Sequence, residues 1–373
     1  MRPIGAIVLG GYADRVGRIP ALMVAIKIMV AATFLITILP DYDAIGVLAP
    51  IGMLIAVVLQ GFSAGGEFGS ATAYLIEQNA RRRGFMGSWQ GASQAASTLA
   101  VTVIIAVLAG TLDQAQFDEW GWRVPFAFGL LLGPVGIYIR RHLEDSPEFT
   151  ATRTGTARPG HPLRTTLTHQ KARMLLVVGV LAVSTGMSYL ISYMPTFAIR
   201  ELGLSAGSSF TATILVGIVL TVGSPIAGHF SDRVGRIRML AAAGTLMLLA
   251  IVPFFLLIRS HPSFAVLTVV LAVMGLIKVW YSGPLGALMA EIFPVHTRGT
   301  GLSIGYNLGV ALFGGLTPVV ATWLIAFTGS TLAPGFWIMF LAALSTVSVL
   351  LAGRYVTTAR SDAEPDRAVS GGS

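Results

Sequence analysis

Long apolar runs separated by short polar loops fill the sequence, and this pattern limits the possible folds more than any other feature. Most runs reach the roughly 17 to 25 residues with which a helix crosses the hydrocarbon core of a bilayer. Since a spanning backbone must satisfy its own hydrogen bonds, such runs predict helices and not strands. Only 11% of the 373 residues are charged, which excludes a soluble enzyme of ordinary composition. The predicted spans are 4–12 (short), 21–39, 47–76, 85–110, 123–139, 174–199, 210–230, 239–258, 264–292, 300–327 and 335–355.

The basic residues fall mainly on one side of these predicted spans. Nineteen of the 25 Lys and Arg residues lie in one set of alternate loops, and Lys27 and Lys278 lie inside spans. The other loops hold only Arg2, Arg123, Arg200 and Arg259. The positive-inside rule therefore predicts a multi-pass membrane protein with the Arg-rich loops cytoplasmic. The net charge of +8 is then a topology signal, and no nucleic-acid partner is expected.

An internal repeat divides the chain into two related halves. The segment from Gly10 to Ile19 recurs from Gly228 to Ile237, and seven of the ten aligned positions are identical. Two related halves are a common plan of transporters. We expect an N-terminal helix bundle at 1–141, a central cytoplasmic loop at 142–172, a C-terminal bundle at 173–356 and a disordered cytoplasmic tail at 357–373.

The repeat also predicts an asymmetry between the halves. Two predicted spans lie between the central loop and the second copy of the motif, whereas nine residues precede the first copy. We therefore expect a first half that lacks one helix and part of the next, so that Met1 would be an internal methionine. The expected fold is all-α, with about eleven segments of which the first is partial.

Several motifs resemble known membrane carriers. The loop from Gly10 to Arg18 resembles the signature of the major facilitator superfamily, which implies two pseudo-symmetric six-helix bundles. Further stretches resemble the bacterial metabolite:proton symporter family, whose members carry citrate, α-ketoglutarate, proline or betaine, and the resemblance covers the chain from the second helix onward. These stretches are Met1–Gly5, Leu59–Glu67, Trp120–Phe126 and Ala290–Pro294, with Ser88–Gln90 and Phe313–Pro318 most similar to the citrate and α-ketoglutarate carriers.

One position departs from the pattern of that family. Its members usually have an arginine three residues before the glutamine of the fourth helix, where this chain has Val57 before Gln60. Proton coupling therefore does not follow from the resemblance alone.

Lys278 is the most informative single residue of the sequence. It lies in the middle of the predicted span 264–292, near the bilayer midplane. A charge at that depth is costly unless it faces a cavity or a partner. One interpretation is a cation that receives a substrate carboxylate, with Tyr281 beside it in the pocket. The other is a structural ion pair with Glu67 or another buried acid.

Glu67 is the acidic counterpart inside a predicted span. Gln60, Glu67 and Tyr74 are spaced by two helical turns and share one helix face. Burial favours the protonated form of a carboxylic acid, so Glu67 is a candidate proton-coupling residue. The alternative is a neutral, hydrogen-bonded clamp between helices.

Other polar residues recur at helical spacing inside apolar spans. Each could bind substrate in a central cavity, or could join helices, which is the commoner use of polar groups in membranes. Together with Lys278, the candidate substrate-binding residues are Gln60, Gln90, Gln94, Tyr189, Tyr193, Tyr281, Tyr306 and Asn307.

The repeated loops predict a gate on the cytoplasmic side. There opposite charges can pair across helix ends, and a carboxylate can lie at a helix N-terminus. Such pairs would hold one face closed and break when it opens, although a static topology anchor is the alternative. The candidate gate residues are Gly10, Asp14, Arg15, Gly17, Arg18, Glu77, Arg83, Gly228, Asp232, Arg233, Gly235, Arg236, Glu291 and Arg298.

These features predict a secondary active transporter and not an enzyme. None of the three lysines lies in a P-loop, and the six histidines show no metal-ligand spacing, so we expect no cofactor and no metal. The expected function is proton-coupled symport of a small organic acid such as citrate or α-ketoglutarate, by a monomer in the lipid bilayer. The alternatives are a proline/betaine-type zwitterion symporter, an inactive fragment and a non-transporting membrane sensor.

Overall fold

The computed structural model describes residues 1–79, 81–141, 162–294 and 297–361, and every regular element in these ranges is helical. This confirms the predicted all-α class. The longer helices are α1 (Arg2–Val16), α2 (Arg18–Ile38), α4 (Leu48–Glu77), α5 (Arg83–Thr111), α7 (Val124–Arg141), α10 (Lys171–Leu202), α11 (Ala206–Val234), α12 (Arg236–Ser260), α13 (Phe264–Glu291), α14 (Arg298–Gly309), α15 (Thr317–Thr328) and α16 (Ala333–Ser361).

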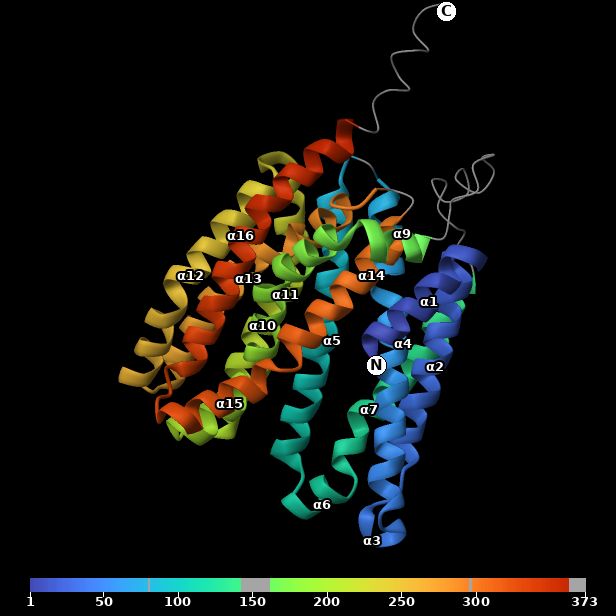
Figure 1. The fold of residues 1–373 in the computed structure, drawn as a ribbon. Helices are drawn as coiled ribbons and strands as arrows, with labels where there is room; N and C mark the ends of the chain where they lie inside the picture. Colours follow the sequence, from blue (N-terminus) through green and yellow to red (C-terminus); the bar gives the residue numbers. More distant parts are fainter. Residues whose placement is uncertain (80, 142–161, 295–296, 362–373) are drawn as a thin grey trace, which may run out of the picture.

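Nine membrane spans are long and apolar enough to cross a bilayer within the described residues, and α14 to α15 count as one of them. Helix α1 has 15 residues and is not one of these nine spans. In Figure 1 the N-terminus lies about halfway along the bundle, so α1 begins deep inside the layer of helices.

Three details differ from the expected spans. The span 300–327 is divided, because the π-helix η3 (Val310–Gly314) separates α14 from α15. Short helices occupy the loops: α3 (Tyr42–Ile45), α6 (Gln114–Glu119), η1 (Gly121–Arg123) and α9 (Pro162–His169). Helix α16 continues to Ser361, beyond the expected start of the tail at 357, and residues 362–373 lie outside the described residues, as does most of the central loop (142–161).

The two halves pack in the same way, as the repeat predicts. Helix α2 packs between α4 and α7 in the first half, and α12 packs between α13 and α16 in the second. Across the molecule, α11 and α13 pack against α5, while α1 and α4 pack against α14. These two equivalent sets of contacts hold the bundles together.

Helix α10 breaks this symmetry. It packs against α14 and α16 and is the most buried of the candidate spans, since 72% of its apolar 18-residue stretch is buried inside the protein. No helix occupies the equivalent place in the described part of the first half. There the apolar stretch of α5, for example, is only 6% buried. The first bundle therefore leaves much more of its helix surface uncovered than the second.

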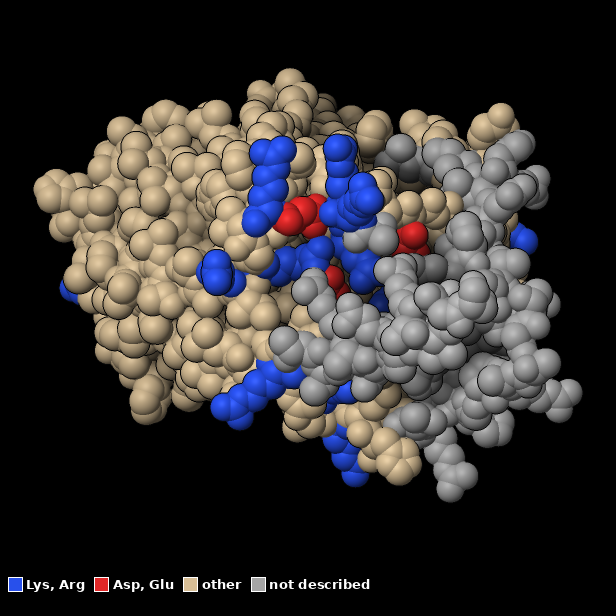
Figure 2. All heavy atoms as spheres, turned by 90° about the horizontal axis from the view of Figure 1, so that it is seen from above, with Lys and Arg blue, Asp and Glu red and all other residues tan. Residues whose placement is uncertain are grey.

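Helix ends with many arginines gather on one side of the molecule, which we call the basic face. It carries the ends of α4, α11 and α13 and the starts of α5, α12 and α14, including Arg81–Arg83, Arg233, Arg236, Arg238 and Arg298. Figure 2 looks onto this face and shows Lys and Arg side chains around a few carboxylates. The α11–α12 turn on this face is tight because Gly235 adopts a φ of 99°, and Gly17 adopts 121° between α1 and α2.

Candidate functional site

The basic face is closed by contacts between the two bundles, and Asp232 lies at their centre. From the end of α11, its carboxylate accepts hydrogen bonds from the backbone N–H groups of Gly84 (2.8 Å) and Phe85 (3.0 Å) at the start of α5. A carboxylate in this position satisfies free N–H groups and complements the positive end of the helix dipole. Asp232 therefore couples the second bundle to the first.

Ion pairs extend this network within the second bundle and across to the first. Arg236 pairs with Asp232 at 2.9 Å and also with Glu291 at the end of α13. Arg298 at the start of α14 lies 3.9 Å from Glu77 of α4, and its Nε donates to the carbonyl of Ala290. The predicted residues Asp232, Arg236, Glu291, Glu77 and Arg298 thus come together in two groups of contacts.

The remaining predicted gate residues have different surroundings. Gly10 is buried, Arg233 is exposed, and the buried Nε of Arg83 has no hydrogen-bond partner among the described residues. The side chains of Asp14, Arg15 and Arg18 lie outside the described residues, so their predicted part in the gate stays a prediction.

Small residues allow the bundles to meet closely beside Asp232. A Cβ atom added to Gly228 of α11 would lie 2.6 Å from the carbonyl oxygen of Gly84, and it would also collide with the side chain of Ser88. Ser88 is fully buried in this contact. Opening the basic face would therefore expose position 88 to solvent.

Asp232→Asn should make the basic face open more often. The substitution removes the charge that holds the start of α5 and the partner of Arg236, which is typically worth about 1 kcal/mol or more. Because the chain contains no cysteine, Ser88→Cys introduces a single thiol, and its rate of maleimide labelling reports opening. We expect labelling to rise at least about fivefold in the Asp232→Asn background. Equal rates in that background and in the exposed control Asp43→Asn would contradict the role of Asp232.

A polar and aromatic cluster joins the bundles deeper in the molecule. Tyr306 of α14 stacks on Phe68 of α4, and Gln94 of α5 donates a hydrogen bond to its hydroxyl (3.3 Å). The ring of Tyr189 of α10 lies against Gly314 of η3, the segment that follows α14. This central cluster brings together Gln94, Tyr189 and Tyr306, which the sequence predicts as substrate-binding residues.

Arg2 lies beside this cluster, which corrects its placement in an outer loop. The residue begins α1, and its backbone carbonyl lies against Gly65 in the middle of α4. The carbonyl of the same Gly65 accepts a hydrogen bond from Asn307, the residue after Tyr306 in α14. In the sequence, Arg2 comes just before a short apolar run and is therefore assigned to a loop. In the structure, α1 starts about halfway along the bundle (Figure 1).

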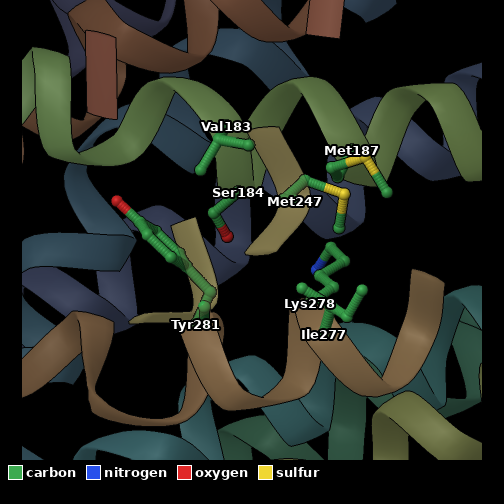
Figure 3. Close-up of a pocket in the computed structure, with 8 residues that line it drawn as sticks. Val183, Ser184, Met187, Met247, Ile277, Lys278 and Tyr281 are labelled. Carbon is green, nitrogen blue, oxygen red and sulfur yellow. The ribbon is translucent and has the colours of Figure 1, made fainter. Parts of the chain in front are cut away.

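Lys278 lines a small cavity between α10, α12 and α13. Its side chain extends from α13 into this cavity, where Met187 and Met247 lie beside it (Figure 3), and its ammonium lies 3.4 Å from the hydroxyl of Ser282. Ser282 in turn hydrogen-bonds Ser184 of α10 at 3.0 Å. No carboxylate forms an ion pair with Lys278 in the part of the chain that the structure describes, so the expected alternative of a pair with Glu67 is not found there.

Glu67 lies on the face of α4 that packs against α2. On this face Gln60 donates to Thr33 (3.2 Å) and Ser63 donates to the carbonyl of Ala25 (2.6 Å), and Glu67 follows Ser63 by one helical turn. Gln60 therefore joins two helices of the first bundle. Glu67 is partly exposed, and its role is not decided by these contacts.

Three more predicted binding residues join helices in the structure. Tyr281 donates to the carbonyl of Val180 (2.7 Å), Tyr193 accepts from Thr322 (3.3 Å), and Asn307 donates to the carbonyl of Gly65 across the bundle interface (2.8 Å). The side chain of Gln90 is partly exposed and has no hydrogen-bond partner among the described residues. Arg2, Ser184 and Ser282 were not predicted as residues near the site. Of these three, only Arg2 could have been found from the sequence, because it is a charged residue next to an apolar run.

Two packed bundles that share an internal repeat, with polar residues between them at mid-depth, define a multi-pass membrane transporter. The Major Facilitator Superfamily model matches residues 3–258 and 211–371, so the chain belongs to the major facilitator superfamily, and its relatives place it among the metabolite:proton symporters.

Three comparisons illustrate the relationship. The citrate-proton symporter of Klebsiella pneumoniae is 40% identical over 92% of this chain and 77% of its own length. The glycine betaine/proline/ectoine/pipecolic acid transporter OusA of Dickeya dadantii is 32% identical over 94% of this chain and 72% of its own length. The proton:xylose symporter XylE has the same fold, with a TM-score of 0.74 at 18% identity over 95% and 84% of the two chains.

Proposed function

We propose that the chain is a symporter that carries a small organic acid of the citrate or α-ketoglutarate type together with a proton. The observation that carries this proposal is Lys278, a cation at mid-depth without a carboxylate partner among the described residues. Such a charge is costly inside a membrane protein unless an anion neutralises it. The relationship to a citrate-proton symporter supports the same substrate class.

The proposed mechanism is alternating access. Substrate binds at the central cluster between the bundles, with one carboxylate directed to Lys278 in its cavity within the second bundle, and the bundles then rock about it. The contacts of Asp232, Glu77 and Arg298 hold the basic face closed and separate when that face opens. We place the basic face on the cytoplasmic side of a bacterial inner membrane, because of its arginines, and the protein acts as a monomer.

A zwitterion such as proline or betaine is the second candidate substrate. The relationship to OusA favours it, and so does the stacked pair of Phe68 and Tyr306, because aromatic faces attract quaternary ammonium groups. A cation such as Lys278 at the site favours the organic acid instead.

Uptake into membrane vesicles tests the proposed function. Vesicles with an inwardly directed proton gradient should accumulate labelled citrate or α-ketoglutarate, and an uncoupler should abolish the accumulation. Accumulation of labelled proline alone would favour the zwitterion. Uptake of none of these would contradict transport and leave the inactive fragment or the membrane sensor.

A further inference from the structure

We infer that Arg2 is a second carboxylate-binding residue of the substrate site, so that the substrate bears at least two carboxylates, one for Arg2 and one for Lys278. The inference rests on the proposed function and deepens it. It distinguishes a di- or tricarboxylate from a zwitterion with a single carboxylate.

The position of Arg2 is that of a site residue. Arg2 precedes the buried Leu9 by two helical turns, so both share the face of α1 that packs against α4. Gly65 of α4 has no side chain to separate the two helices at this level. The residue is only partly buried. The carbonyl of Gly65 accepts a hydrogen bond from Asn307, so Tyr306 and its partner Gln94 offer further polar groups near this level of the interface.

No carboxylate of the described residues neutralises the charge of Arg2. Among the described residues, its side chain forms neither an ion pair nor a hydrogen bond. A guanidinium offers a planar fork of donors that matches a carboxylate. An arginine without a partner inside a membrane protein is a strong candidate for an anionic ligand.

The depths of the two cations match. Arg2 is the first residue of α1, a helix of four turns, and Lys278 lies about halfway along α13, a helix about twice as long. At about 1.5 Å per residue, both lie roughly 20 Å from the ends of these helices at the basic face. They belong to different bundles, so one multivalent anion that binds both would draw the bundles together.

The internal repeat argues that these charges are not needed by the fold. When the alignment of the repeated motif is continued toward the N-terminus, Arg2 corresponds to Leu220 of α11. Helices α4 and α13 align with Glu77 on Glu291, and Lys278 then corresponds to Ala64. Equivalent places in the same architecture are thus filled by apolar residues, which points to a role in binding.

The test uses Arg2→Gln, Arg2→Lys and the matched control Arg259→Gln, which removes an exposed charge at the far end of α12. Uptake of labelled citrate is measured with three competitors on one five-carbon chain: tricarballylate, glutarate and valerate, with three, two and one carboxylates. We expect Arg2→Gln to raise the KM for citrate about tenfold or more and to remove most of the advantage of glutarate over valerate. Arg2→Lys should keep part of the affinity for citrate and part of the preference for glutarate over valerate.

Two results separate the inference from the proposed function. If the unmodified protein transports citrate while Arg2→Gln retains its KM and its preference for glutarate at equal membrane abundance, the inference is overturned and the proposed function stands. If the unmodified protein accumulates proline and not citrate, both are overturned. A change in KM of the same size in Arg259→Gln would also overturn the inference, because it would reflect overall charge.

Discussion

Lys278→Gln should reduce the efficiency of citrate uptake by about two orders of magnitude or more. The glutamine side chain is one bond shorter than that of lysine and stays polar, but it has no charge for a substrate carboxylate. Leaving a buried charge without its partner costs about 3–5 kcal/mol, and about 1.4 kcal/mol corresponds to a factor of ten. The measurement is the initial rate of labelled citrate uptake as a function of concentration, corrected for the amount of protein in the membrane.

The chain offers a matched control for this substitution. Lys27 is exposed on α2, so Lys27→Gln removes an equivalent charge away from the cavity and should leave citrate uptake within about twofold of the unmodified value. Lys278→Arg keeps the charge but places a larger head group in the small cavity lined by Met187 and Met247, so we expect partial activity. An unchanged KM in Lys278→Gln would refute the role of Lys278 in substrate binding.

The sequence predicts the architecture well because the bilayer enforces it. Apolar length and the repeat of Gly10–Ile19 predict the helices, their pairing in two halves and the turn at Gly235, since each depends on local residues. The motif also predicts that a carboxylate such as Asp232 can lie at a helix N-terminus, but that this helix is α5 is known only from the structure.

The central site could not be predicted to the same degree. Asn307 donates to the carbonyl of Gly65 in the other half of the chain, and Tyr306 stacks on Phe68, so both contacts depend on how the two bundles pack. A tyrosine at helical spacing can line a cavity or join helices, and only the packing of α13 on α10 shows that Tyr281 binds the carbonyl of Val180. The depth of Arg2 required knowledge of where α1 starts relative to α4.

Glu67→Gln should separate transport from proton coupling. If Glu67 carries the proton, the amide fixes a neutral side chain that can neither gain nor lose one. We expect exchange of labelled citrate against internal citrate to continue at a comparable rate, because exchange needs no net proton movement. Accumulation driven by a proton gradient should fall by about tenfold or more, since an inward pH difference of one unit supports about a tenfold concentration ratio for one coupled proton.

This substitution also distinguishes the two interpretations of Glu67. A helix clamp at the α4–α2 interface needs a hydrogen-bonding side chain of the right length, which glutamine supplies, so gradient-driven accumulation would survive in Glu67→Gln. A proton carrier needs a carboxyl group, so Glu67→Asp should keep part of the accumulation that Glu67→Gln loses. Normal accumulation in Glu67→Gln would therefore show that a residue other than Glu67 carries the proton.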